Sequence, residues 1–303
     1  MNSRLHVPAA LVLLLAAQSS GFAQTTPARP QFEVASLKLN TACNNRSGGE
    51  QPPTPGRLHL ACITLKDLIQ LAYGFLGDGK TFNRQRLDVL GLPKWADEDR
   101  YDLAAKAEGA ARVEQMGGPM LQALLEDRFR LKLHRESREV SVYALTVGKN
   151  GPKLQPMKEG SCVEVDLNHL PPPPAPGQPM PRFCGNASWR SMGKTVTLDG
   201  HGMTMAEFAQ SFAIRVDHPV IDKTAIAGKF DFHLEFGRDE MPGMRPQGTA
   251  ADPANPANPA QASDPAGPSL FAAIQEQLGL KLVSEKGQTD FLVVDHVEKP
   301  TDN

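Results

Sequence analysis

The sequence has few aromatic residues and almost no excess of either charge. Phe, Trp and Tyr make up 6% of the 303 residues, so no stacking platform for bases or sugars is evident. Lys and Arg total 32 against 34 Asp and Glu, which gives a formal net charge of −2. Without a broad basic field, we expect no nucleic acid partner.

The common catalytic and cofactor motifs are also missing. The chain contains no Gly-x-Ser-x-Gly elbow, His-Glu-x-x-His helix, Gly-x-Gly-x-x-Gly turn or P-loop. Ser191 and Lys194 match a Ser-x-x-Lys nucleophile pattern, but Gly193 and the extended pattern after it disfavour the helix that this chemistry needs. We therefore assign no catalytic residue and no cofactor, and we favour a protein without enzymatic activity.

Long apolar runs are confined to the first residues. Residues 1–23 combine Arg4, an apolar run from Val7 to Ala17 and small residues at the end, as in a secretory signal peptide. The run is shorter than the roughly 20 apolar residues that span a bilayer. We therefore expect a periplasmic or secreted protein with no transmembrane anchor after signal removal. Removing Arg4 from the 32 basic residues leaves 31 against 34 acidic ones, a net charge of −3.

Cysteines are few and lack the Cys-x-x-Cys spacing of zinc sites. Export permits disulfides, and four cysteines allow three pairings. We favour the two sequence-local pairs, Cys43–Cys62 and Cys162–Cys184, because each would close a polar, Gly- or Pro-rich loop without a core of its own.

The chain contains a building block that occurs twice. Residues 118–133 match 267–282 at a constant offset of 149, and residues 64–72 match 204–212 at an offset of 140. Thr64 and Thr204 each begin a helical pattern with an acidic residue three positions later, as in a capping box. Tyr101-Asp-Leu is answered by Phe230-Asp-Phe. The order of these matches predicts an internal duplication.

Hydrophobic periodicity gives each half the order β-α-β-β-α-β-β. The last two strands of each half are predicted as hairpins over 131–147 and 280–297. We predict an α+β fold with a first lobe at 24–150 and a second lobe at 193–303, in which two helices cover one sheet face and the other face is free to bind.

Two segments fall outside this plan. Residues 151–192 form a Pro-rich, Cys-containing insert with a run from Pro171 to Pro174, either a stiff stapled loop or a polyproline segment for an aromatic groove. Residues 238–268 form an apolar-poor stretch in which we expect disorder.

Histidines of the second half raise the question of a metal site. His233, His296, Asp231 and Asp295 are the candidate ligands, and three or four of them would have to converge. We expect instead that each is solvent-facing or hydrogen-bonded, with no metal bound.

A basic stretch at the end of the first lobe is the other candidate. Arg128, Arg130, Arg135 and Arg138 could contact an anionic polymer or a protein partner. Acidic residues are interleaved with them, so a solvated surface of mixed charge is the default interpretation.

Several phrases resemble one family. Residues 32–38, 64–74, 121–129, 219–224, 228–232 and 295–301 look like the soil-associated paralogue family, which is expanded in soil bacteria such as the Acidobacteria. The resemblance implies no known activity or catalytic residue. Similar domains are fused behind membrane metallopeptidases of the antibiotic-sensor type, which implies a role in sensing outside the cytoplasm. Each half also resembles the short N-terminal domain of secretins and TonB-dependent receptors, an analogy of fold alone.

These observations favour an exported, non-catalytic binding protein, with an unknown protein or small ligand of the cell envelope as its partner. One alternative is a hydrolase of envelope polymers with a metal or acid/base site in the second lobe. Another is a scaffold that recruits a partner through the Pro-rich loop.

Overall fold

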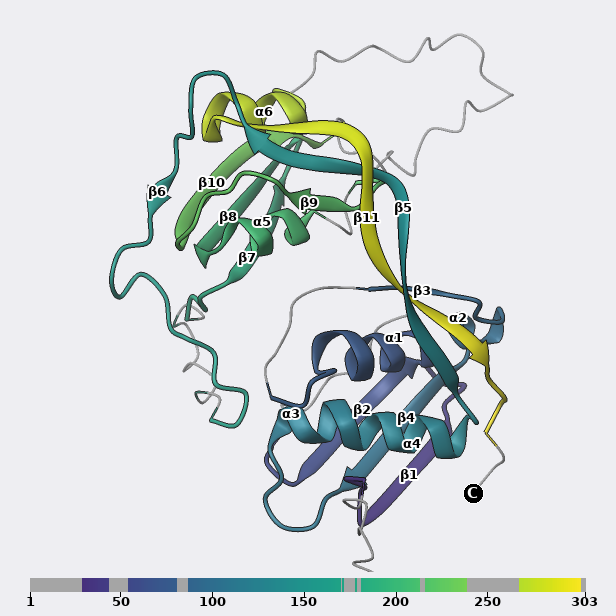
Figure 1. Ribbon diagram of the computed structural model, residues 1–303. Helices are drawn as coiled ribbons and strands as arrows, with labels where there is room; N and C mark the ends of the chain where they lie inside the picture. Colours follow the sequence, from purple (N-terminus) through teal and green to yellow (C-terminus); the bar gives the residue numbers. More distant parts are fainter. Residues whose placement is uncertain are drawn as a thin grey trace, which may run out of the picture.

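The computed structural model has an α+β fold in which two lobes are joined by two long strands (Figure 1). The structure describes residues 29–43, 54–80, 87–169, 171, 178, 181–212, 216–238 and 267–300. The predicted signal peptide, most of the proline run and residues 239–266 of the predicted disordered loop lie outside these residues.

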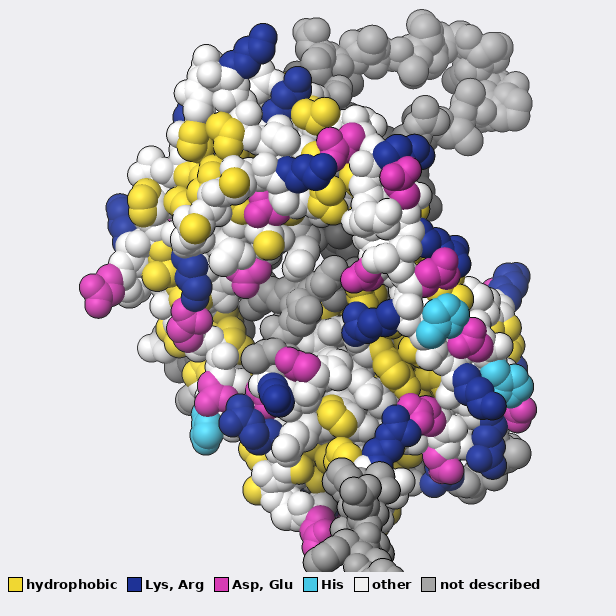
Figure 2. Space-filling view, viewed as in Figure 1, with side chains coloured by type: hydrophobic (Ala, Val, Ile, Leu, Met, Phe, Trp, Pro, Cys, Tyr) yellow, Lys and Arg dark blue, Asp and Glu magenta, His cyan; other side chains and the backbone are white. Residues whose placement is uncertain are grey.

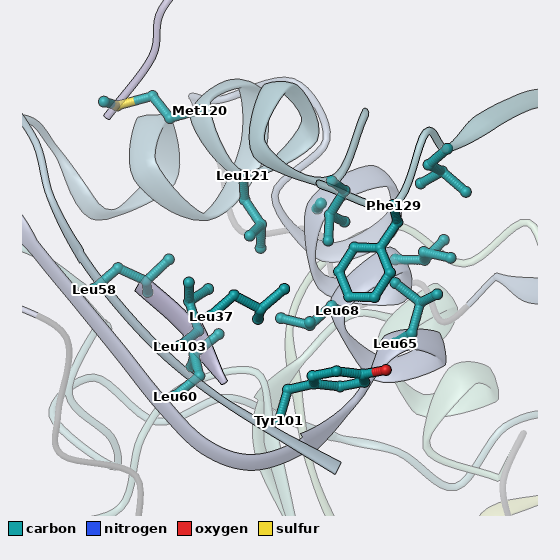
Figure 3. Close-up of a cluster of buried hydrophobic side chains, with 14 of the residues drawn as sticks. Leu37, Leu58, Leu60, Leu65, Leu68, Tyr101, Leu103, Met120, Leu121 and Phe129 are labelled. Carbon is teal, nitrogen blue, oxygen red and sulfur yellow. The ribbon is translucent and has the colours of Figure 1, made fainter. Parts of the chain in front are cut away.

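The first lobe is an antiparallel sheet with helices on one face. Its strand order is β1 (Val34–Leu39), β4 (Arg100–Lys106) and β2 (Arg57–Thr64). The helices are α1 (Leu65–Ile69) with its π-helical continuation η1 (Gln70–Phe75), α2 (Trp95–Glu98), and α3 (Val113–Gln115), η2 (Met116–Met120) and α4 (Leu121–Arg128) in succession. Figure 3 shows Leu68, Leu121 and Phe129 facing strand residues such as Leu103.

The second lobe repeats this plan with a larger sheet. Its strand order is β6 (Gln155–Pro156), β10 (Phe230–Gly237), β8 (Thr195–Met203) and β7 (Asn186–Met192), all antiparallel. Helices α5 (Met205–Ser211) and α6 (Leu270–Leu278) pack on one face around buried Phe208, Phe212 and Ile274.

Both predicted helix caps are present, but only one forms a full capping box. The Glu207 carboxylate accepts the backbone N–H of Thr204 at 2.8 Å, and Thr204 Oγ1 accepts the N–H of Glu207. The shorter Asp67 accepts only the Thr64 hydroxyl, also at 2.8 Å. The reciprocal backbone bond therefore needs the extra methylene of glutamate.

A third sheet connects the lobes, and it corrects the prediction of two hairpins. Residues 132–147 form one continuous strand, β5 (Lys132–Val147), and residues 280–296 form another, β11 (Leu280–His296). They pair with each other, from Leu280 opposite Val147 to Val294 opposite Leu133. Residues 136–139 contain no Gly or Pro to turn the chain. Gly287 does not form a turn. It permits close packing, because a Cβ there would lie 2.7 Å from Val142 Cγ2.

Two short strands complete this ribbon. Each pairs with the long strand that comes from the other half of the chain. Strand β3 (Asp88–Leu90) runs parallel to β11, with Val89 opposite Leu292. Strand β9 (Val220–Asp222) runs parallel to β5, with Val220 opposite Tyr143.

Each hydrophobic core consequently contains residues from both halves of the sequence. Leu292 and Val294 of β11 are buried in the first core beside Leu131. Leu145 of β5 is buried in the second core beside Leu280 and Leu282. The ribbon therefore makes the two lobes depend on each other for their cores.

The two halves also share an unusual backbone feature. Cys62 and Gly202 both interrupt a strand with a positive φ, 53° and 55°. The backbone N–H of each donates to the Oδ1 of an aspartate on the adjacent strand, Asp102 or Asp231, at 2.9 Å. Cys62 and Gly202 correspond at the offset of 140, and Asp102 and Asp231 are the central residues of the matched Tyr101-Asp-Leu and Phe230-Asp-Phe. A common ancestry of the halves stays a prediction.

Both predicted disulfides, Cys43–Cys62 and Cys162–Cys184, are confirmed. Cys62 lies in a β-bulge of the first lobe, where the register of β2 with β4 shifts between Leu60 and Ile63. In the second lobe the disulfide packs against the corresponding bulge at Gly202. A Cβ on Gly202 would lie only 2.8 Å from Cys162 Sγ. The space that the disulfide occupies therefore excludes a side chain at 202, whereas the equivalent left-handed position of the first lobe accepts Cys62.

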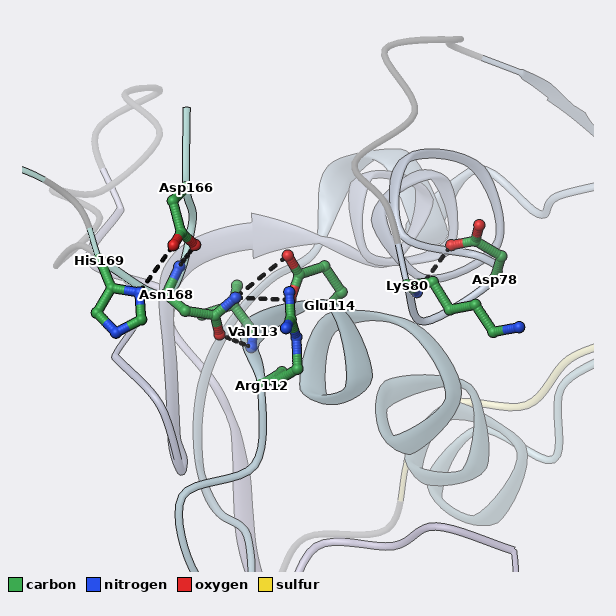
Figure 4. Close-up of polar contacts among 8 residues, drawn as sticks. All are labelled: Asp78, Lys80, Arg112, Val113, Glu114, Asp166, Asn168 and His169. Atoms are coloured by element: carbon green, nitrogen blue, oxygen red, sulfur yellow. Dashed lines mark hydrogen bonds and ion pairs between the residues drawn. The ribbon is translucent and has the colours of Figure 1, made fainter. Parts of the chain in front are cut away.

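The insert also contacts the first lobe (Figure 4). Asn168 Oδ1 accepts the backbone N–H of Val113 at 2.9 Å, at the start of α3. Asn168 Nδ2 donates to the buried Glu114 carboxylate at 3.0 Å, and Leu167 packs against the first core. The insert is therefore a second connection between the lobes.

Replacing Leu292 by alanine tests the shared core. Leu292 is fully buried in the first core although it lies near the end of the described chain, so Leu292→Ala should cost about 3 kcal/mol of unfolding free energy. Urea denaturation of the oxidised protein measures this. Leu39→Ala is the control, because Leu39 is 51% exposed on the edge strand β1, and it should change stability by less than about 0.5 kcal/mol. Equal effects of the two variants would contradict the shared core.

Candidate functional site

A groove lies on the face of the second sheet that the helices leave open. Its volume is about 850 Å³. Strands β6, β7, β8 and β10 form the floor, and the part of the insert between β6 and β7 forms a wall. The lining residues are Gln155, Pro156, Lys158, Ser161, Pro181, Arg182, Phe183, Asn186, Ser188, Arg190, Asp199, His201, Asp231, Phe232 and His233.

Strand alternation explains why the floor is polar. Along β7, Ala187 and Trp189 pack against the second core, whereas Ser188 and Arg190 line the groove. Along β10, Phe232 and Leu234 are buried while His233 is exposed. Successive strand residues point to opposite faces, so one side of each strand supplies core and the other supplies the floor.

The register places the floor residues in rows across the strands. Ser188 lies opposite Asp199, and Asp199 lies opposite His233. In the next row, Asn186 lies opposite His201. Neighbouring side chains on one sheet face are close enough to interact, so these rows form one continuous polar surface.

Asp199 is the centre of the first row. Its Oδ1 lies 2.7 Å from Nδ1 of His233, and its Oδ2 accepts a hydrogen bond from Arg190. Partial burial pushes the pKa of Asp199 upward, but the bonds from His233 and Arg190 outweigh it and hold that pKa below its usual range. Asp199 is therefore an ionised acceptor already bound by its neighbours.

Asp231 is bound in a similar way at the base of the groove. Its Oδ1 accepts the Gly202 N–H and lies 4.0 Å from Nδ1 of His201. This carboxylate therefore fixes the bulge against which the Cys162–Cys184 disulfide packs.

The insert supplies two further cations. Lys158 and Arg182 line the groove, and among the described residues neither side chain has a hydrogen bond or ion pair. Their backbones are fixed on either side of the disulfide. The Lys158 carbonyl accepts the N–H of Ser161 at 3.0 Å, and the Arg182 carbonyl accepts the N–H of Val163 at 2.8 Å.

The arrangement does not have the order of a nucleophilic triad. Asp199 lies between Ser188 and His233, so the histidine is next to the acid and not next to the serine. Within the described chain, the group of ligand atoms close enough for a metal is that of Cys43, Cys62 and Asp102. Both sulfurs there are bonded to each other.

The four candidate metal ligands lie at two separate places. Asp231 and His233 line the groove on β10. Asp295 and His296 end β11 beside the first lobe, where Asp295 Oδ2 lies 3.0 Å from Nδ1 of His134 and His296 Nε2 lies 2.9 Å from Glu298 Oε1. The four side chains do not converge on one point.

The arginine stretch is likewise not one site. Arg128 Nε lies 3.5 Å from Asp127, Arg135 donates to the Tyr73 carbonyl, and Arg138 donates to Glu136 at 2.7 Å. Arg130 occupies a left-handed turn, with φ of 50°, between α4 and β5. Figure 2 shows basic and acidic side chains interspersed on the face in view.

Sequence reasoning missed most of the groove, including Lys158, Arg182, Arg190 and Asp199. One signal was available in the alternation of polar with apolar residues over 186–190, 197–201 and 231–235. Such alternation predicts strands with one polar face, and three of them in one sheet make a polar surface.

Asp199→Asn should remove a pH-dependent part of the stability. The folded-state pKa of Asp199 is depressed, so its stabilisation is present above the unfolded value near 3.9 and is lost as pH falls through the folded value. We expect the variant to be less stable by about 1 kcal/mol at pH 7, with the difference shrinking below about pH 4. Thermal unfolding between pH 3 and 7 measures this. Glu235→Gln, two residues from His233 on β10, is the control. A stability difference between Asp199→Asn and the unsubstituted protein that stays constant from pH 3 to 7 would contradict the depressed pKa of Asp199.

Comparison with known proteins gives a family without a described activity. No curated protein and no solved structure matches the chain. Among the described residues, none of the helices is both long and apolar enough to cross a bilayer. A model of a protein family of unknown function (DUF3738) matches residues 66–297, a span that includes parts of both lobes and all the named lining residues of the groove. The chain therefore belongs to the DUF3738 family.

Proposed function

We propose that this protein is an exported, non-catalytic binding protein whose ligand lies in the groove of the second lobe. The observation that carries the proposal is the polar floor, in which rows of side chains from three strands line one hollow of about 850 Å³. A concave site with several convergent polar groups is the usual form of a small-molecule site. Its ligand is a component of the cell envelope or its surroundings.

The N-terminal residues and the disulfides support export. Residues 1–23 have the pattern of a signal peptide. Both disulfides are typical of proteins outside the reducing cytoplasm. Both features support a location in the periplasm or the medium. The resemblance to domains fused with sensor-type peptidases supports a role in envelope sensing.

Rigidity of the site supports binding without chemistry. The floor belongs to a four-stranded sheet, and the Cys162–Cys184 disulfide fixes the wall. Asp199 and Asp231 are both held by protein donors before any ligand arrives. A preorganised polar site loses little conformational entropy when its ligand binds.

A second candidate function rests on the contact between Asp199 and His233. A histidine 2.7 Å from a carboxylate can act as a general base, so a hydrolase of envelope polymers would use His233 with Asp231 nearby. Turnover of such a polymer that His233→Gln abolishes without changing stability would favour this candidate over simple binding.

Filling the groove tests the proposed function. Ser188→Trp places a large side chain on the floor and should abolish ligand binding while leaving the second core unchanged, because Ser188 is exposed. A thermal-shift screen of small molecules on the oxidised protein identifies ligands, since a compound at 100 times its Kd stabilises the fold by about 2.7 kcal/mol.

The matched control is Ser191→Trp, which lies on the same strand but not in the groove. We expect this control to keep the ligand-induced shift that Ser188→Trp loses. Ligands that stabilise both variants equally would place binding elsewhere.

A further inference from the structure

The groove carries more positive than negative charge. Among the described residues, Lys158, Arg182 and Arg190 line it together with two carboxylates, Asp199 and Asp231. The two histidines of the lining, His201 and His233, are left out of this comparison.

The protein itself already binds both carboxylates. Asp199 accepts from Arg190 and His233, and Asp231 accepts the Gly202 N–H. These contacts leave Lys158 and Arg182 as the cations without a partner among the described residues. The groove therefore offers two cationic donors without a partner among the described residues. Asp199 is paired with Arg190, whereas Asp231 is hydrogen-bonded through Oδ1 alone.

The backbone holds these two cations on one wall. Residues 158–161 form a turn, and Val163 pairs with Phe183 in a short parallel bridge. The Cys162–Cys184 disulfide links the two limbs of the insert between them. Lys158 and Arg182 therefore stand at defined places on either side of the disulfide, facing the same hollow.

The floor adds neutral donors opposite this wall. Asn186 and Gln155 carry amide donors, and Ser188 carries a hydroxyl, all lining the groove. Carboxylates accept hydrogen bonds from amides and hydroxyls and form the strongest ones with guanidinium groups. In the part of the chain that the structure describes, the aromatic lining residues are Phe183 and the largely buried Phe232, so stacking of a neutral sugar ring has little support.

We propose that the groove binds a small organic ligand bearing two or more carboxylates, with Lys158 and Arg182 as its charge partners. This rests on the proposed function, which makes the groove the binding site. The ligand is of small-molecule size, because a hollow of about 850 Å³ lies within the range of such sites. A cationic ligand would meet two unpaired positive charges and is excluded by the same contacts.

Three blocked tripeptides of matched size provide the probes. N-acetylated, C-amidated Glu₃, Gln₃ and Lys₃ share one backbone and differ in charge. Titration calorimetry on the oxidised protein at pH 7 should give a Kd for Glu₃ at least about tenfold below that for Gln₃, and no binding of Lys₃. Raising the salt from 50 to 300 mM should weaken Glu₃ binding, because paired charges at a groove mouth are screened.

Charge-removing variants identify the partners. Lys158→Gln and Arg182→Gln should each weaken Glu₃ binding by roughly fivefold, and the double variant should remove the preference over Gln₃. Arg135→Gln is the control, since Arg135 lies on the ribbon outside the groove, and it should leave the Kd unchanged.

The outcomes separate this proposal from the proposed function. No measurable binding of Glu₃, equal binding of Glu₃ and Gln₃, or a preference that survives in the double variant would overturn the carboxylate assignment. If Gln₃ or Lys₃ binds instead and Ser188→Trp blocks it, the groove remains a binding site for another ligand class. If Ser188→Trp leaves all binding unchanged, the groove is not the binding site.

Discussion

The pairing of β5 with β11 is the interaction on which the rest of the structure depends. Sixteen Cα partner pairs run along this ribbon, and its ends enter both lobes. Leu292 and Val294 fill the first core, whereas Leu145 fills the second. An isolated two-stranded ribbon is at best marginally stable in water, so the cores stabilise the ribbon as much as the ribbon connects them.

The groove depends on this framework through a short series of contacts. Strand β10 packs against α6, and the chain continues from α6 directly into β11. On the other face of β10, Asp231 holds the bulge at Gly202, and the bulge leaves room for the Cys162–Cys184 disulfide. That disulfide positions the insert, which also reaches the first lobe through Asn168. The groove wall is thus fixed to both lobes.

Local patterns in the sequence predicted the local structure well. The α+β class and both disulfides are confirmed, and Thr64 and Thr204 cap their helices as expected. These features rest on interactions between residues close in sequence, or on spacing that leaves few choices. The strands 131–147 and 280–297 were predicted as hairpins because a break in hydrophobic alternation resembles a turn. Their true partners lie about 150 residues away, and no local signal specifies such a pairing.

The candidate site shows the same limit. The polar residues of β7, β8 and β10 could be identified as one face of each strand, but their convergence needs the strand order and the register. Lys158 and Arg182 come from a Pro-rich loop, where periodicity gives no information. The histidines attracted attention by residue type alone, and the structure separates His233 from His296 by placing them in different sheets.

The position of β11 along the chain also affects the order in which the protein folds. Strand β11 follows every other described helix and strand, yet neither core is filled without it. A chain in which β11 has not yet paired with β5 would therefore have two incomplete apolar cores. Because most partner residues of β11 lie far away along the chain, its pairing is a slow, non-local step that completes both cores together.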